Sequence, residues 1–131
     1  MKINITVDNS NELLTLYSAS ELVQAIRQLP VETENVVILE TENEVPINGL
    51  ISLAAYHYST RSETTKVSFF KRKTTSTGIT KSYYRVQVEM MGKNGKTRDY
   101  YLTESIDEVC NILTTFYDYQ ITPNITNWIE Y

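Results

Sequence analysis

The sequence predicts an α+β fold: an antiparallel β-sheet meander of about five or six strands with two helices packed on one face, in the order β-α-β-β-β-β-β-α. Several segments alternate apolar and polar residues with a period of two, which is typical of strands with one buried face. Two other segments repeat apolar residues every three or four positions, as amphipathic helices do. At 131 residues, the chain is expected to form a single domain, residues 1–131.

The clearest element is a hairpin. Every second side chain is apolar over residues 82–91, which predicts a strand. Asn94-Gly95 follows as a pair that tolerates the positive φ of a tight turn, and the chain returns over residues 96–102. With a two-residue turn, Val88 would lie opposite Tyr101 on the same face of the sheet.

Further strands are expected over residues 2–7, 35–40, 49–58 and 66–72, where apolar residues alternate or form short runs between turn residues. Residues 12–17 fit either a short strand or an irregular link. In the third of these strands, alternation places Tyr56 and Tyr58 on one face with Leu50, and His57 on the other. The connecting segments are the turns over 8–11 and 59–65, the polar link over 41–46 and a loop over 73–81.

Two helices are expected, and each begins with a capping box. The first is predicted over residues 19–29, because Pro30 disfavours the helical conformation in the residue before it. The second starts after Ser105 and carries an apolar stripe at spacings of three and four. The two boxes are Ser18 with Glu21 and Ser105 with Glu108, and the stripe consists of Ile106, Val109, Cys110, Leu113, Phe116 and Tyr117.

Charge is segregated along the chain, although the net charge is only −4. Residues 1–60 carry eight acidic and two basic side chains, residues 61–98 carry two acidic and ten basic ones, and residues 99–131 carry six acidic ones and no Lys or Arg. Such asymmetry can mark a binding surface, or the segments can neutralise each other within the sheet.

No catalytic, metal or cofactor motif is recognised. The chain has one histidine, His57, and one cysteine, Cys110, which lies on the apolar stripe and is expected in the core. Zinc needs more soft ligands than these, and the four glycines form no phosphate-binding loop. One cysteine permits no internal disulfide, and the N-terminus lacks the apolar run of a signal peptide. We therefore expect a non-enzymatic cytoplasmic protein without a cofactor.

Two surfaces are candidates for binding. Glu40, Glu42 and Glu44 would project on one side of an extended link and could dock a basic partner. Basic residues of the middle strands, interleaved with exposed tyrosines, resemble the aromatic and basic make-up of single-strand nucleic-acid binders, although the pI near 5.0 argues against that function. The residues of this second surface are Lys71, Arg72, Lys73, Tyr83 and Tyr100.

The C-terminal segment resembles the ending of small immunity proteins from polymorphic toxin systems. A strand over 98–102 and a helix over 106–119 are followed by Pro123 and, five residues later, Trp128, as in the Pro-x-x-x-x-Trp segment of that family. The resemblance covers less than a third of the chain, and the glycine that typically precedes the proline is missing. We expect the tail to be extended and packed back onto the body.

The resemblance implies a non-catalytic protein that neutralises a partner enzyme, a bacterial toxin or nuclease, by binding it. Small acidic single-domain proteins without catalytic motifs are also common among phage-encoded inhibitors of bacterial defence, including anti-CRISPR proteins, and this type is the alternative. A nucleic-acid-binding module that uses the basic middle strands is the other alternative.

Overall fold

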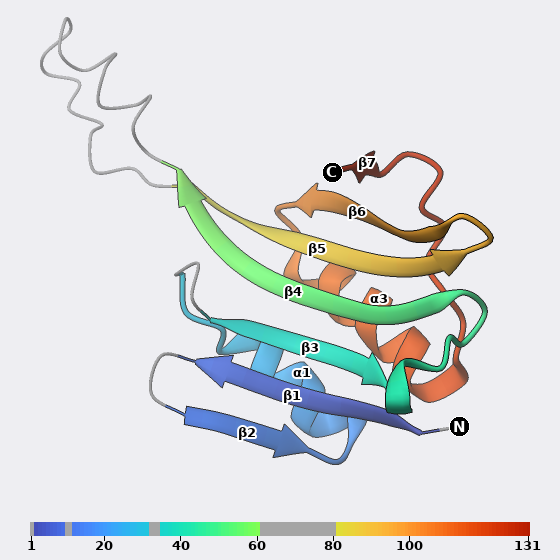
Figure 1. Ribbon diagram of the computed structural model, residues 1–131. Coiled ribbons are helices and arrows are strands. Elements are labelled where there is room, and N and C mark those ends of the chain that lie inside the picture. Colours follow the sequence, from blue (N-terminus) through green and yellow to red (C-terminus); the bar gives the residue numbers. More distant parts are fainter. Residues whose placement is uncertain (1, 10–11, 32–34, 61–80) are drawn as a thin grey trace, which may run out of the picture.

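The computed structural model describes residues 2–9, 12–31, 35–60 and 81–131. Within them, seven strands form one sheet in the order β2-β1-β3-β4-β5-β6-β7, and all neighbouring strands are antiparallel (Figure 1). The elements are β1 (Ile3–Asn9), β2 (Glu12–Leu16), α1 (Ala19–Arg27), β3 (Val36–Thr41), the short 3₁₀ helix η1 (Glu42–Glu44), β4 (Leu50–Thr60), β5 (Lys81–Gly92), β6 (Gly95–Thr103), α3 (Ile106–Tyr119) and β7 (Ile129–Glu130).

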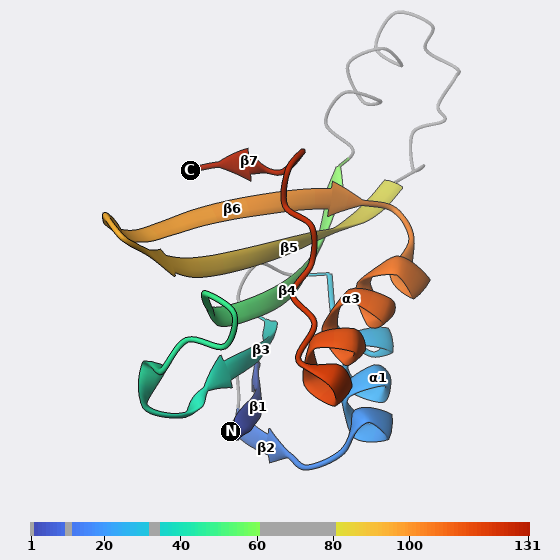
Figure 2. The same ribbon diagram turned by 90° about the vertical axis from the view of Figure 1, so that its right-hand side faces the viewer.

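Both helices lie on the same face of the sheet, as Figure 2 shows from the side. The predicted α+β class and the two-layer arrangement are therefore confirmed. The ambiguous segment over 12–17 forms the edge strand β2, and the tail adds the short strand β7. The strand predicted over 66–72 and most of the loop predicted over 73–81 lie outside the described residues.

The core lies between the helices and the sheet. Alternate residues of the central strands face it, because successive side chains of a strand point to opposite faces. The stripe on α3 contributes Phe116 and Leu113, both fully buried, and α1 contributes Leu22 and Ile26. The sheet contributes Ile5, Val37, Leu39, Leu50, Leu53, Ala55, Tyr84, Val86 and Val88.

The two helix starts are capped as the sequence predicts. Ser18 Oγ accepts a hydrogen bond from the backbone N–H of Glu21, and Ser105 Oγ accepts one from the N–H of Glu108. The distance between nitrogen and Oγ is 3.1 Å in both. The carboxylate of Glu21 accepts from the Tyr17 N–H at 2.9 Å, so this box reaches back one residue further than expected. The first helix ends at Arg27, two residues earlier than predicted.

Two register predictions were wrong. In the hairpin, Gly92 pairs with Gly95, so the turn residues are Lys93 and Asn94, and Val88 lies opposite Asp99 instead of Tyr101. Within this turn only Gly95 has a positive φ (109°). Compared with the prediction, the pairing of the two strands is shifted by two residues. A shift of two leaves the faces unchanged, so the expected sharing of one face by Val88 and Tyr101 holds.

The second error concerns Leu50. A register irregularity between Leu50 and Ser52 reverses the alternation there, because a bulge places an extra residue in one strand. Leu50 therefore joins the core instead of sharing a face with Tyr56. No helix among the described residues is long and apolar enough to cross a membrane.

Candidate functional site

The face of the sheet that points away from α1 and α3 is not covered by any element that the structure describes (Figures 1 and 2). We call it the open face. The strand register arranges its side chains in rows across the sheet. The rows are Glu40, Ser52, Glu89 and Arg98; Ile38, Ala54, Gln87 and Tyr100; Val36, Tyr56, Arg85 and Leu102; and Tyr58 with Tyr83.

Tyrosines gather on this face. The ring of Tyr58 stacks against that of Tyr83 with centroids 5.5 Å apart, and against that of Tyr56 at 6.1 Å. Beyond β6, the C-terminal Tyr131 meets Tyr100 edge to face, with centroids 5.6 Å apart. Five aromatic rings from β4, β5, β6 and the C-terminus therefore form one surface, which we call the tyrosine cluster.

Arg85 lies within the tyrosine cluster. Its guanidinium carbon is 4.0 Å from the ring centroid of Tyr100 and 4.9 Å from that of Tyr131, which are cation–π distances. Its Nε is buried and makes no hydrogen bond to any residue that the structure describes. Tyr131 is held in place from both ends, because its hydroxyl donates to Gln87 Oε1 at 2.8 Å and its N–H donates to the Arg98 carbonyl at 3.0 Å.

Burial affects the chemistry of Tyr56. Burial is the main cause that raises the pKa of its phenol, neighbouring Tyr58 and Tyr131 add to the shift, and Arg85 acts against it. The hydroxyl therefore stays protonated at neutral pH, and it can donate as well as accept a hydrogen bond.

A hollow of about 320 Å³ opens beside the tyrosine cluster. Its lining includes the small side chains of Ser52 and Ala54 on β4 and the rings of Tyr56 and Tyr131. The remaining lining is mixed in charge: Glu40 and Glu89 are acidic, and Arg98 pairs with Glu89 at 3.3 Å.

The predicted site residues are only partly brought together. Tyr83 and Tyr100 lie on the open face, as predicted, and Glu40 lies at the rim of the hollow. The prediction of an extended link over residues 41–46 was wrong. Glu42 and Glu44 lie in η1, where Asn43 and Glu44 take φ values of 55° and 57°. The three glutamates therefore do not project on one side.

Glu44 instead forms an exposed ion pair, with Lys96 Nζ 3.1 Å from its Oε1. Exposed pairs of this kind contribute little to stability. The predicted basic residues Lys71, Arg72 and Lys73 lie outside the described residues.

Sequence reasoning missed Arg85 and Tyr131 as members of a site. Arg85 alternates with apolar residues, so its place on the open face was predicted, but nothing in the sequence indicated that two rings would hold it. Tyr131 lies 46 positions further along the chain, and only the pairing of β7 with β6 brings it there. The sequence did contain a signal for Tyr56 and Tyr58. They lie two positions apart in a strand, which places both on one face, and the neighbouring strand alternates strongly.

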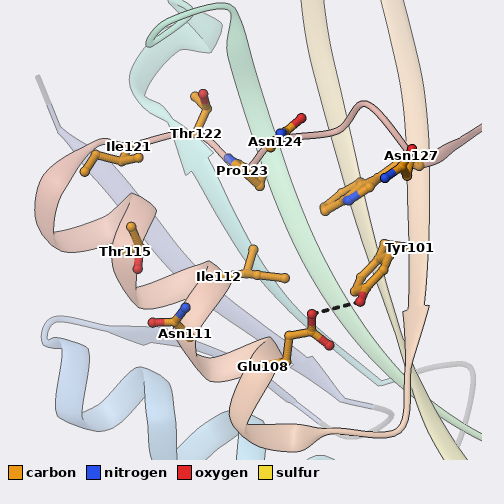
Figure 3. A pocket seen from close by; sticks show the side chains of 11 residues that line it. Tyr101, Glu108, Asn111, Ile112, Thr115, Ile121, Thr122, Pro123, Asn124 and Asn127 are labelled. Atoms are coloured by element: carbon orange, nitrogen blue, oxygen red, sulfur yellow. Dashed lines mark hydrogen bonds between the residues drawn. The ribbon is translucent and has the colours of Figure 1, made fainter.

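A second pocket of about 330 Å³ lies between α3 and the tail. Figure 3 shows Glu108 pointing toward Tyr101, whose hydroxyl donates to Glu108 Oε2 at 2.8 Å, and Thr103 Oγ1 donates to the other carboxylate oxygen at 2.6 Å. Trp128 stacks on Tyr101 with centroids 5.5 Å apart. The Trp128–Tyr101 stack attaches the tail to the body, as expected, and the two hydrogen bonds join α3 to β6 and engage both oxygens of the carboxylate in this pocket.

Cys110 is buried in the core, as predicted, and His57 is partly buried on β4, opposite Tyr84 of β5. The His57 ring stacks on Tyr84 at 4.2 Å, and its Nδ1 lies 2.9 Å from the Leu29 carbonyl, so Nδ1–H is the donor. Burial raises the pKa of the Cys110 thiol, against the opposing effect of Arg27, so the thiol is held in its unreactive protonated form.

Among residues 2–9, 12–31, 35–60 and 81–131, no three His, Cys, Asp or Glu side chains gather as metal ligands. Comparisons of the chain with protein-family models, with curated proteins and with solved structures found no match.

Proposed function

We propose that this protein is a non-catalytic inhibitor that acts in the cytoplasm by binding a partner enzyme, a bacterial toxin or nuclease, through the open face of its sheet. The observation that carries the proposal is the tyrosine cluster around Arg85 on a face that neither helix covers. Tyrosine and arginine are enriched among the residues that contribute most to protein–protein binding.

Two further observations support binding over chemistry. The thiol of Cys110 is buried, and burial raises its pKa and keeps it protonated, so it is not arranged as a nucleophile. Glu40 lies at the rim of the open face, where an acidic group can steer a basic partner surface toward the tyrosines. The same mechanism would serve an immunity protein or a phage-encoded inhibitor of a defence nuclease.

Nucleic-acid binding is the second candidate, because stacked tyrosines on a sheet together with an arginine are also the platform on which single-stranded bases stack. Fluorescence polarisation with labelled oligo(dT) tests it. Binding that weakens steeply with salt would support this candidate, and no binding at low salt would exclude it.

The inhibitor proposal is tested by affinity capture from nuclease-treated lysate of the native host, with the wild type and two variants as bait. Tyr58→Ala/Tyr83→Ala removes a stacked pair from the open face. Tyr119→Ala is the matched control, because Tyr119 lies on α3 and is 72% exposed.

We expect an enzyme that is retained by the wild type and the control but not by the open-face variant, and whose activity falls when the wild-type protein is added. An enzyme that binds the open-face variant equally well, or whose activity is unaffected, would contradict the proposal.

A further inference from the structure

Among the residues that the structure describes, the partly buried Arg85 has no acidic partner. The described residues contain three ion pairs, Arg27 with Asp107, Lys96 with Glu44 and Arg98 with Glu89, and Arg85 is in none of them. Its Nε is fully shielded and makes no hydrogen bond within the described chain. A buried donor without an acceptor is unfavourable, so its presence calls for an explanation.

The two rings beside Arg85 fix the position of its guanidinium. Tyr100 lies at 4.0 Å and Tyr131 at 4.9 Å, and Tyr131 is itself anchored through its hydroxyl to Gln87. A planar guanidinium whose position is fixed by rings loses little side-chain entropy when its N–H donors bind an acceptor. The arrangement is therefore preorganised for an anion.

We infer that Arg85 is a preformed receptor for a carboxylate, supplied by an Asp or Glu side chain of the protein partner. The inference rests on the proposed function and names the chemistry that the partner must present. Carboxylate and phosphate both match the guanidinium fork, because each can accept two parallel N–H bonds.

The charges of the open face favour the carboxylate. Arg98, the other arginine in the cross-strand rows, is neutralised by Glu89, and Glu40 lies at the same rim. One uncompensated cation can pair with one carboxylate, whereas binding of a nucleic-acid backbone relies on several phosphate contacts. The net charge of −4 adds to the repulsion of a polyphosphate.

The test uses the full chain and a display library of random linear peptides. Peptides are selected on the wild type and counter-selected against Tyr58→Ala/Tyr83→Ala, so that open-face binders are enriched without selection on Arg85 itself. Each selected peptide and its Asp→Asn or Glu→Gln version are then titrated against the wild type, Arg85→Gln and Arg98→Gln. Arg98→Gln is the matched control, because Arg98 lies on the same face but already has an acidic partner.

We expect that an acidic residue is common to the selected peptides and that its amide version binds the wild type about tenfold or more weakly. Arg85→Gln should bind the selected peptide more weakly by the same factor and should show no further loss of affinity with the amide peptide. Arg98→Gln should retain the wild-type affinity. Circular dichroism and urea unfolding establish whether each variant is folded. If Arg85→Gln does not fold, Arg85→Met replaces it.

Any one of four outcomes would overturn the inference. Open-face peptides without an acidic residue, or equal binding to Arg85→Gln, would exclude the carboxylate receptor and leave the proposed function standing. Oligo(dT) binding that depends on Arg85 would assign the guanidinium to phosphate. If counter-selection leaves no peptide that binds the wild type better than Tyr58→Ala/Tyr83→Ala, the open face is not a protein-binding surface, and the proposed function fails together with the inference.

Discussion

The guanidinium carbon of Arg85 lies 4.0 Å above the ring of Tyr100, on the face of the sheet opposite to the helices. The two residues come from neighbouring strands, and Tyr131 approaches the same guanidinium from the C-terminal segment. Together these two contacts join β5, β6 and the tail within the tyrosine cluster. We expect substitution of Arg85 to weaken partner binding while changing the stability of the fold little, so mutation can separate the two effects.

Replacing Arg85 by Met is expected to change the free energy of unfolding by about 1 kcal/mol or less. The cation–π contact is lost, but so is the buried Nε that has no acceptor, and the apolar stem of Met still fills the space between the rings. Urea unfolding followed by circular dichroism measures the difference. A loss of about 3 kcal/mol would mean that Arg85 is a structural residue.

Replacing Phe116 by Ala is expected to lower the free energy of unfolding by about 3–5 kcal/mol. Phe116 is the largest fully buried side chain among the described residues, and its removal leaves a cavity between α3 and the sheet. Tyr119→Ala on the same helix is the control and should change stability by about 0.5 kcal/mol or less, since Tyr119 is largely exposed. Equal losses in the two variants would contradict the packing described for α3.

Replacing Ser105 by Ala is expected to destabilise the protein by about 0.5–2 kcal/mol. The hydroxyl accepts a hydrogen bond from the Glu108 N–H at 3.1 Å, one of the otherwise unpaired donors of the first helical turn. Ser105→Asp provides the matched rescue variant, because Asp is also a strong N-cap residue and should restore most of the stability. A fully stable alanine variant would show that the cap contributes nothing.

Stability is expected to fall at alkaline pH. Burial raises the pKa of the Cys110 thiol above its ordinary value of 9.0 and those of the Tyr56 and Tyr84 phenols above 10.0. The unfolded chain therefore loses these protons at lower pH than the folded chain does. Their contribution is complete below about pH 9 and is lost as pH rises through the folded-state values.

The urea midpoint measured at increasing pH tests this linkage. In Cys110→Ala, the part of the decline that begins near the thiol's ordinary pKa should disappear, while the later part caused by the tyrosines remains. A midpoint that stays constant up to about pH 11 would show that the folded and unfolded chains release these protons at the same pH.

Local patterns predicted most of the fold. The alternation over residues 82–91, the two capping boxes and the apolar stripe on α3 each depend on neighbours in sequence, and each was confirmed. Errors arose where one extra or displaced residue changes which residues of two neighbouring strands lie opposite each other. The bulge beside Leu50 and the displaced turn at Lys93 and Asn94 are set by how two strands fit together, which periodicity does not encode.

The candidate site was less predictable than the fold. Tyr83 and Tyr100 were placed on the correct face by alternation alone. The predicted alignment of Glu40, Glu42 and Glu44 on one side of an extended link was wrong, because the chain turns at Glu42–Glu44 to connect β3 with β4. The positive φ of Glu44 is not favoured by its residue type. The position of Tyr131 depends on how the tail pairs with β6, a contact between distant parts of the chain.

The central claim is that the open face binds the protein partner. Isothermal titration of the captured enzyme with the wild type, Tyr100→Ala and Tyr119→Ala tests it most directly. Because tyrosine anchors contribute about 2 kcal/mol or more, we predict that Tyr100→Ala weakens binding by about thirtyfold while Tyr119→Ala has no effect. Equal affinity of the wild type and a folded Tyr100→Ala variant would contradict the claim and place the interface elsewhere.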